Sequence, residues 1–258
     1  MHAAVASPLI LLAAVIASAQ APAQTSPGGP GKIATNIAGI SAFPVPPANF
    51  NPMSATEAEL EQYGFPPRPN RLLGPDALAR WQRRVRDQTR IVPELVQTGT
   101  FHGPARTIKQ TRTKPSVIEG TSENWSGVVI VDKGNPFGNP TMQVEARFVV
   151  PKPVAGCKSG TERYSSANWV GIDGAFSNDV LQAGTETDLN CASGATYYAW
   201  IEWYPNSEVK VSNLPVAGGD LMSISVFIAS DGGKHLSVEN LTAQKSVSLA
   251  MQDRKSVV

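Results

Sequence analysis

The chain has 258 residues, with 22 Lys and Arg against 21 Asp and Glu, so its net charge near neutral pH is only +1. This length allows one sizeable hydrophobic core plus additional segments, and the 22 Gly and 21 Pro residues favour turns over long helices. A membrane-spanning helix needs about 20 apolar residues, and the run Leu9–Ala17 is shorter. We expect one principal domain without a membrane anchor.

The first 19 residues have the pattern of a secretory signal peptide. The apolar run Leu9–Ala17 leads into Ala17-Ser18-Ala19, and Ala21-Pro22-Ala23 offers a second set of small residues for cleavage. The preceding residues include His2 but no Lys or Arg, so a buried N-terminal strand is the alternative interpretation. We expect a secreted protein, either extracellular or periplasmic.

The chain has two cysteines, Cys157 and Cys191. In an oxidising compartment a disulfide between them is the first expectation, while free thiols or partners on a segment outside the chain are the alternatives. Their spacing fits no zinc motif, and the chain has no His-Glu-x-x-His sequence. We therefore expect no metal site.

Histidines for a nucleophilic triad are also scarce. The three histidines are His2, His102 and His235, and only His235 falls in the expected folded domain. It follows the turn-like Asp231-Gly-Gly-Lys, so we interpret it as a solvated loop residue rather than a catalytic base.

Residues 20–121 are rich in Pro, Gly and polar residues and show no sustained strand alternation, which predicts a mostly irregular segment. Two short helices are expected within it. The first begins with Ser54 as N-cap and Glu57 three residues later, and ends at Gly64. The second follows Pro75-Asp76 and runs through Val85, with Arg80, Arg83, Arg84 and Arg86 mostly facing away from its partner surface. Such short helices are marginal alone, so we expect both to dock.

The near-neutral total charge hides two opposed halves. Residues 20–121 carry 12 Lys and Arg against 7 Asp and Glu, a net charge of +5, whereas residues 122–252 carry 8 against 13, a net charge of −5. This asymmetry favours a prosegment held partly by charge, and a solvated linker is the alternative. The basic part lacks interleaved aromatic residues on a folded platform, so we expect no nucleic-acid binding.

After Thr121 the pattern changes to short runs with period-two alternation, which is typical of an antiparallel all-β domain. The turns between them include Asn135–Pro140, Ala217–Asp220 and Asp231–Gly233. We predict a β-sandwich of the concanavalin-like jelly-roll type. The expected strands are Trp125–Val131, Met142–Val150, Ala167–Ile172, Val180–Ala183, Tyr197–Tyr204, Leu221–Ala229 and Leu236–Leu241.

The most informative strand is Tyr197-Tyr-Ala-Trp-Ile-Glu-Trp-Tyr-Pro205. Alternation places Tyr198, Trp200, Glu202 and Tyr204 on one face, and their neighbours on the face packed between the sheets. A carboxylate among three aromatic rings is typical of a ligand groove, where poor hydration would raise its pKa. An exposed aromatic strand or an oligomer interface is the alternative.

Two neighbouring strands would add further polar groups to this face. Trp169, Gly171 and Asp173 alternate together in one of them, and Gln182 lies in the other. A single Gln in a strand is usually an outward polar residue. Beside a carboxylate, however, its amide could stabilise an oxyanion while the carboxylate activates water.

Five segments resemble, in order and spacing, the motifs of the glutamic peptidases, or eqolisins. They are Asn124-Trp-Ser-Gly127, Phe148-Val-Val-Pro151, Trp169-Val-Gly-Ile-Asp-Gly174, Val180-Leu-Gln-Ala-Gly184 and Trp200-Ile-Glu-Trp-Tyr-Pro205. The resemblance covers about residues 122–252. More loosely, Tyr63-Gly-Phe-Pro-Pro-Arg68 is similar to prosegments of the bacterial members.

The resemblance implies a two-sheet sandwich and a secreted proenzyme (zymogen) that becomes an acid endopeptidase without metal or cofactor. It implies that Gln182 is the catalytic glutamine that polarises the scissile carbonyl. Trp125, Trp169, Asp173, Trp200, Glu202 and Tyr204 fall on positions that line or support the substrate groove. The implied partners are polypeptide substrates and the chain's own prosegment, and we expect a monomer.

The dyad's Glu belongs to a later motif, Ala-Glu-Trp-Ile-Val-Glu or similar, which the chain does not contain. The resemblance stops at Gln252, and a codon string that spells Asp253–Val258 matches a common sequencing adapter. We therefore expect a truncated, inactive copy, divided into a signal peptide (1–19), a prosegment or linker (20–121), an incomplete sandwich (122–252) and a non-native tail (253–258).

The competing interpretation is a carbohydrate-binding or glycoside-hydrolysing jelly roll, because aromatic strands around Glu202 could also stack on sugars. Glycoside hydrolysis requires two carboxylates about 5 to 9.5 Å apart, and the sequence identifies no second acid. A non-catalytic binding domain is a third possibility.

Overall fold

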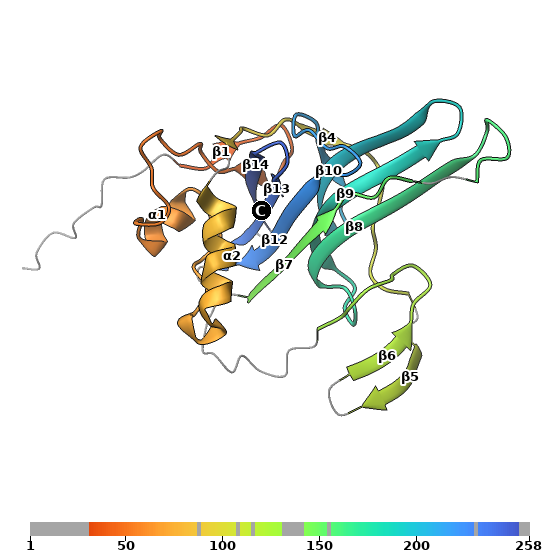
Figure 1. Cartoon of the computed structure of the whole chain (residues 1–258), viewed down its shortest axis with the longest axis horizontal. Helices are drawn as coiled ribbons and strands as arrows, with labels where there is room; N and C mark the ends of the chain where they lie inside the picture. Colours follow the sequence, from red (N-terminus) through yellow and green to blue (C-terminus); the bar gives the residue numbers. More distant parts are fainter. Residues whose placement is uncertain are drawn as a thin grey trace, which may run out of the picture.

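The computed structural model describes residues 31–86, 89–106, 109–114, 117–130, 142–153, 156–229 and 232–252. The expected signal peptide, the turn at 135–140 and the expected tail at 253–258 lie outside these residues. Two antiparallel sheets face each other, and helices lie against the outer side of one of them (Figure 1). The predicted all-β sandwich is therefore confirmed.

The larger sheet has seven strands in the order β1-β2-β14-β13-β12-β7, with β3 pairing parallel to β14. Its strands are β1 (Ile33–Ala34), β2 (Ile40–Ala42), β3 (Thr89–Arg90), β7 (Met142–Val149), β12 (Leu221–Ile228), β13 (Lys234–Asn240) and β14 (Lys245–Met251).

The smaller sheet has five strands in the order β4-β11-β10-β9-β8. These are β4 (Leu95–Gln97), β8 (Arg163–Asp173), β9 (Val180–Asn190), β10 (Gly194–Tyr204) and β11 (Val209–Val211). A separate hairpin of β5 (Lys109–Lys114) and β6 (Val117–Thr121) stands apart from the two sheets (Figure 1).

The hydrophobic core lies between the two sheets. Its side chains alternate along the strands, as in Met222, Ile224 and Val226 of β12 and Ala199 and Ile201 of β10. All five are at most 1% exposed. Because a strand's side chains point alternately to opposite faces, the residues between them are placed on the outer faces.

Six of the seven predicted strands are present, but the predicted strand at 125–131 is wrong. Residues 125–130 form no strand, and Val128 and Ile130 are 90% and 85% exposed. Trp125 instead donates from its indole Nε1 to the carbonyl of Gly103 at 3.1 Å. Although its apolar residues alternate, the segment 125–130 pairs with no neighbouring strand in the described structure.

Both predicted helices are present, with corrections. Helix α1 (Glu57–Gln62) has Thr56, not Ser54, as its N-cap, because the Thr56 hydroxyl and the Glu59 side chain form a reciprocal capping box. Helix α2 (Pro75–Arg86) follows a single 3₁₀ turn, η1 (Arg71–Leu73). A second small core joins the helices, formed by Ala55, Leu60, Phe65, Trp81 and Val85.

The expectation that Arg84 faces away from the protein is wrong. Arg84 is 4% exposed and donates from Nε to Glu239 at 2.6 Å and from Nη1 to Glu145 at 3.1 Å. Its Nη2 donates to Ser225 at 2.8 Å. These contacts dock α2 on the outer face of the larger sheet, which agrees with the view in Figure 1.

His235 is also not a solvated loop residue. It is 1% exposed in β13, and its ring packs edge-on against Phe43 and Phe227 with centroid distances of 4.7 and 4.9 Å. Phe43 comes from the segment before the domain. The strand begins at Lys234 because β12 and β13 form a tight hairpin whose pairing extends to Ile228 and Lys234.

Residues before 98 add strands to one edge of each sheet. β2 and β3 pair with β14, and β4 pairs with β11. Edge strands with free backbone groups promote aggregation, and these added strands pair the backbone groups of β14 and β11 within the same chain. Among the described helices, none is both long and apolar enough to cross a membrane.

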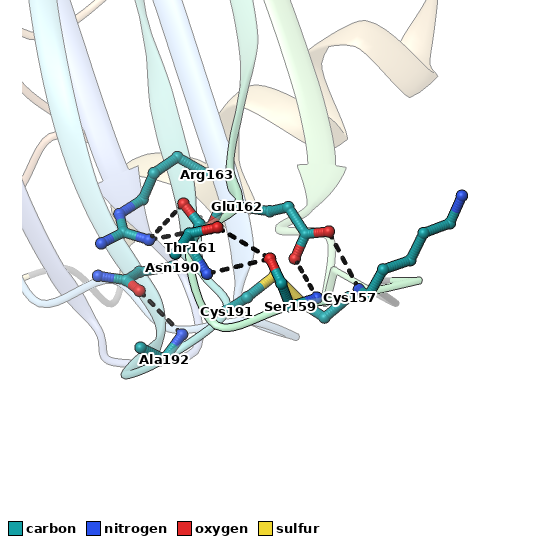
Figure 2. The surroundings of a disulfide bond; sticks show 9 residues. Cys157, Ser159, Thr161, Glu162, Arg163, Asn190, Cys191 and Ala192 are labelled. Atoms are coloured by element: carbon teal, nitrogen blue, oxygen red, sulfur yellow. Dashed lines mark hydrogen bonds between the residues drawn. A yellow bond between two sulfur atoms is a disulfide. The ribbon is translucent and has the colours of Figure 1, made fainter.

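Cys157 and Cys191 form a disulfide, with a Cα–Cα distance of 5.9 Å. Figure 2 shows how it joins the loop before β8 to the turn that follows β9. In the same loop, the Glu162 carboxylate accepts hydrogen bonds from the backbone N–H groups of Lys158 and Ser159 at 3.1 and 2.8 Å. The sequence had left this pairing open.

Candidate functional site

Gly171, Gln182 and Glu202 form one row across β8, β9 and β10, three adjacent strands of the smaller sheet. Gly171 lies opposite Gln182 in the β8–β9 register, and Gln182 lies opposite Glu202 in the β9–β10 register. A Cβ at Gly171 would come within 3.0 Å of the Gln182 Cβ, so the glycine leaves space for the glutamine side chain. We call this outward side of the sheet the front face.

Gln182 and Glu202 form a buried pair. Both residues are 0% exposed, and Gln182 Nε2 donates to Glu202 Oε2 at 3.0 Å. The same nitrogen donates to the carbonyl oxygen of His102. Because both partners are acceptors, the amide orientation of Gln182 follows from its contacts.

Residues 98–105, which we call the crossing segment, cover the front face. After β4, the segment exchanges backbone hydrogen bonds with Glu208, through Thr98 N–H at 3.2 Å and the Thr100 carbonyl at 2.8 Å. At its far end, the Ala105 N–H donates to the Gly174 carbonyl at 3.0 Å. The segment therefore runs from one edge of the smaller sheet to the opposite one.

The main chain of His102 is held by the Gln182–Glu202 pair on both sides. Its N–H donates to the Glu202 carboxylate oxygens at 3.1 and 3.0 Å, while its carbonyl accepts from Gln182. The crossing segment is thus bound through one peptide N–H and one carbonyl at the centre of the front face.

The side chain of His102 lies on Trp200 between two carboxylates. The two rings stack with a centroid distance of 4.3 Å and an interplanar angle of 15°. His102 Nε2 lies 2.7 Å from Glu208 Oε2 and 3.6 Å from Glu186 Oε2. Glu186 and Glu208 are buried, at 4% and 0% exposure.

Burial changes the titration of this group. Burial raises the pKa of Glu202 to about 7, although the His102 N–H and the Gln182 amide oppose the shift. Burial likewise raises the pKa of Glu186 to about 7, against the charge of His102. Burial alone would lower the pKa of His102, but the hydrogen bond to Glu208 and the charges of Glu202 and Glu186 raise it above its usual value.

A second row of the front face consists of Trp169, Gly184 and Trp200, which lie opposite one another in the strand register. A Cβ at Gly184 would lie 2.7 Å from the Trp200 ring and 2.8 Å from the Trp169 Cβ. Only glycine lets both indoles lie over the sheet. Trp125 packs edge-on against Trp169 with a centroid distance of 4.7 Å.

The remaining predicted site residues lie at the ends of these strands. The Tyr204 ring lies beside Gly103 of the crossing segment, where a Cβ would be 3.4 Å from its Cε2 atom. Asp173 ends β8 with a positive φ of 72° and is exposed. Of the predicted site residues, Trp125, Trp200, Glu202 and Tyr204 therefore contact the crossing segment together with Gln182, whereas Asp173 lies at the rim.

Among the described residues, one group has the side-chain types and spacing of a metal site. His102, Glu186 and Glu208 place one ligand atom each within 4.8 Å of one another. The short contact between His102 Nε2 and Glu208 Oε2 already pairs the imidazole with a carboxylate. We therefore describe the group as an ion-paired cluster.

Sequence reasoning missed His102, Glu186 and Glu208. Glu186 could have been found, because it continues the alternation Gln182, Gly184, Glu186 on the same face of β9. The predicted strand stopped at Ala183, before this position. His102 and Glu208 lie in irregular segments, where alternation gives no signal.

Comparisons with known proteins identify the family. Residues 123–257, more than half of the chain, match the model of the Peptidase A4 family. The chain is 32% identical over 146 residues to aspergillopepsin-2 of Aspergillus niger, covering 50% of this chain and 49% of that protein. It is 30% identical over 153 residues to scytalidopepsin B of Scytalidium lignicola, covering 59% and 52%.

Among solved structures, the chain is similar to scytalido-glutamic peptidase crystallised with a transition state analog inhibitor. The identity is 31%, the match covers 45% of this chain and 53% of that one, and the TM-score is 0.36. The chain spans about half the length of the relatives it matches. On the family match, the chain belongs to the Peptidase A4 family, the glutamic peptidases of the eqolisin type.

Proposed function

We propose that this chain is the precursor of a secreted acid endopeptidase in which Gln182 polarises the scissile carbonyl. The observation that carries the proposal is the contact between the Gln182 amide and the carbonyl of His102. A peptide lying across the front face thus presents its carbonyl to the side chain that the family resemblance makes catalytic. An oxyanion formed at this carbonyl would accept the same hydrogen bond.

In the reaction, a water oxygen bonds to the carbonyl carbon, the C–N bond breaks, and a proton passes to the leaving nitrogen. Gln182 would stabilise the oxyanion, while a glutamate of the dyad activates the water. The motif that carries that glutamate in the family is not among the 258 residues. Glu202 acts here as a positioning residue, because its carboxylate accepts from Gln182 Nε2 and orients the amide.

The pKa of Glu202 gives a physical reason for acid activity. An ionised Glu202 would place a negative charge next to the developing oxyanion and oppose it. When a peptide covers the front face, as the crossing segment does here, burial raises the pKa of this carboxyl to about 7, so it is neutral at acid pH and this repulsion disappears. The Gln182–Glu202 hydrogen bond can persist, since a neutral carboxyl still accepts.

The crossing segment supports the assignment of a prosegment. It occupies the front face at Gln182, where a substrate would have to bind, and it precedes the domain in the chain. Basic residues before the domain contact acidic residues within it, as Arg84 does with Glu239 and Glu145. We propose that residues up to about 121 inhibit the enzyme until they are removed.

The direct experiment compares two substrate classes at acid pH. A completed domain, in which the family's Glu-bearing motif follows residue 252, is incubated with a denatured protein and separately with soluble β-glucans. We expect cleavage of the protein alone. Release of sugars from the glucans without proteolysis would instead support a glycoside hydrolase.

A further inference from the structure

The crossing segment shows where one substrate side chain would bind. Because Gln182 and Glu202 hold the main chain of His102, the position of its side chain relative to the sheet is determined. That side chain occupies a site formed by Trp200, Glu186 and Glu208, which we call the acidic subsite. The inference below rests on the proposed function.

The acidic subsite combines a flat apolar surface with negative charge. Trp200, which is 0% exposed, provides the surface on which the imidazole stacks. Glu186 and Glu208 place carboxylate oxygens 3.6 and 2.7 Å from His102 Nε2. Stacking on an indole beside carboxylates favours a planar or aliphatic cation over a neutral side chain.

The subsite has more acceptors than His102 uses. Glu186 Oε2 and Glu208 Oε1 are buried and have no hydrogen-bond partner. Among the described ion pairs, His102 is the one cation in contact with Glu186 or Glu208. A lysine ammonium has three donors and an arginine guanidinium five, so either could satisfy oxygens that the imidazole leaves unpaired.

The geometry points to a specificity site: the acidic subsite binds the side chain on the carbonyl side of the scissile bond and selects Lys, Arg or protonated His there. The side is assigned because Gln182 contacts the carbonyl of His102, the residue whose side chain fills the subsite. Preferred substrates are therefore polypeptides cleaved after a basic residue, and Glu186 and Glu208 are the residues that determine this preference.

The first test uses the full chain and replaces His102 by Lys, Arg, Gln or Phe. Hydrogen exchange of residues 98–105 at pH 7 measures how firmly the segment is bound, and melting temperatures confirm folding. We expect the H102K and H102R variants to protect the segment at least tenfold better than H102Q and H102F. In the E186Q/E208Q background this difference should disappear. Equal protection by H102F and H102K would overturn the proposal.

The second test uses the completed domain after removal of the prosegment, with peptide pairs that differ only in Lys or Gln before the cleaved bond. We expect kcat/KM to favour Lys at least tenfold, and E186Q/E208Q to abolish the ratio while still cleaving the Gln peptide. Cleavage before Lys would contradict the assigned side. A ratio of kcat/KM values near one would contradict the preference for a basic side chain. If the completed domain cleaved neither peptide, the proposed peptidase function would be contradicted. The hydrogen-exchange experiment would still test the acidic subsite, because it does not depend on turnover.

Discussion

Gln182 and Glu202 lie directly opposite each other on β9 and β10, and the glutamine amide donates to the glutamate carboxylate at 3.0 Å. The crossing segment places the peptide groups of His102 on this pair. Catalysis, inhibition and pH response are therefore expected to depend on the same few atoms.

Stability should fall as the pH rises from about 5 to 8. The pKa values of Glu186 and Glu202 are raised from 4.5 to about 7 in the folded chain, so both groups favour the native state at low pH and oppose it above about 7. The raised pKa of His102 acts in the same direction, because its contribution is lost as the pH rises through that value.

Urea unfolding at pH 5 and pH 8 measures this difference, which should be of the order of 1–3 kcal/mol for each carboxyl. The E202Q variant imitates the neutral form and should reduce the pH dependence. An identical dependence in E202Q and the parent chain would show that Glu202 titrates normally.

Replacing Arg84 by Met should destabilise the precursor by about 3–5 kcal/mol, because it leaves buried Glu239 without its charged partner. R80M is the matched control, since Arg80 lies on the same helix but is exposed, and it should change the free energy of unfolding by less than about 0.5 kcal/mol. Denaturant titration of both variants measures the effect. Similar losses in the two would mean that the helix, not the ion pair, is responsible.

Replacing both cysteines by Ser should lower the free energy of unfolding by about 2–4 kcal/mol, since Cys157 and Cys191 are 34 residues apart and close a long loop. The same loss should appear on adding a reductant to the parent chain, and the reductant should have no effect on the double variant. A parent chain that is insensitive to reduction would indicate that the bond does not form.

Adding a methyl group at Gly184 should disturb the two flanking indoles. The Cβ of G184A would lie within 2.8 Å of Trp169 and Trp200, which predicts a loss of about 1–3 kcal/mol. G127A has no atom within 4 Å of its added Cβ and is the control. Tryptophan fluorescence and thermal unfolding of both variants should separate them, and a G184A chain as stable as G127A would contradict the packing.

The sandwich could be predicted because alternation is a local property of each strand. In β10, Ala199 and Ile201 are buried in the core while Trp200 and Glu202 face outward, as their positions require. The resemblance to the family motifs then identified Gln182 as a candidate catalytic residue. The segment at 125–131 alternates equally well, but residues 125–130 pair with no strand in the described part of the chain, which a single segment cannot reveal.

The crossing segment could not be predicted, because its placement depends on contacts between residues distant in the chain. His102 is 80 residues from Gln182, 100 from Glu202 and 106 from Glu208. Burial of Arg84 against Glu239, 155 residues away, has the same origin. The net charges of the two halves, +5 and −5, and the marginal stability of two short isolated helices indicated that the halves would associate, but not where.

The most direct test of the account is the rate at which the completed domain hydrolyses a denatured protein at acid pH, with Gln182 and with Q182A. Loss of an oxyanion donor predicts a fall in kcat of about 10²- to 10³-fold. Q143A, which changes an exposed glutamine on the opposite sheet, should retain full activity. A Q182A enzyme as fast as Q143A would show that Gln182 does not act on the scissile carbonyl.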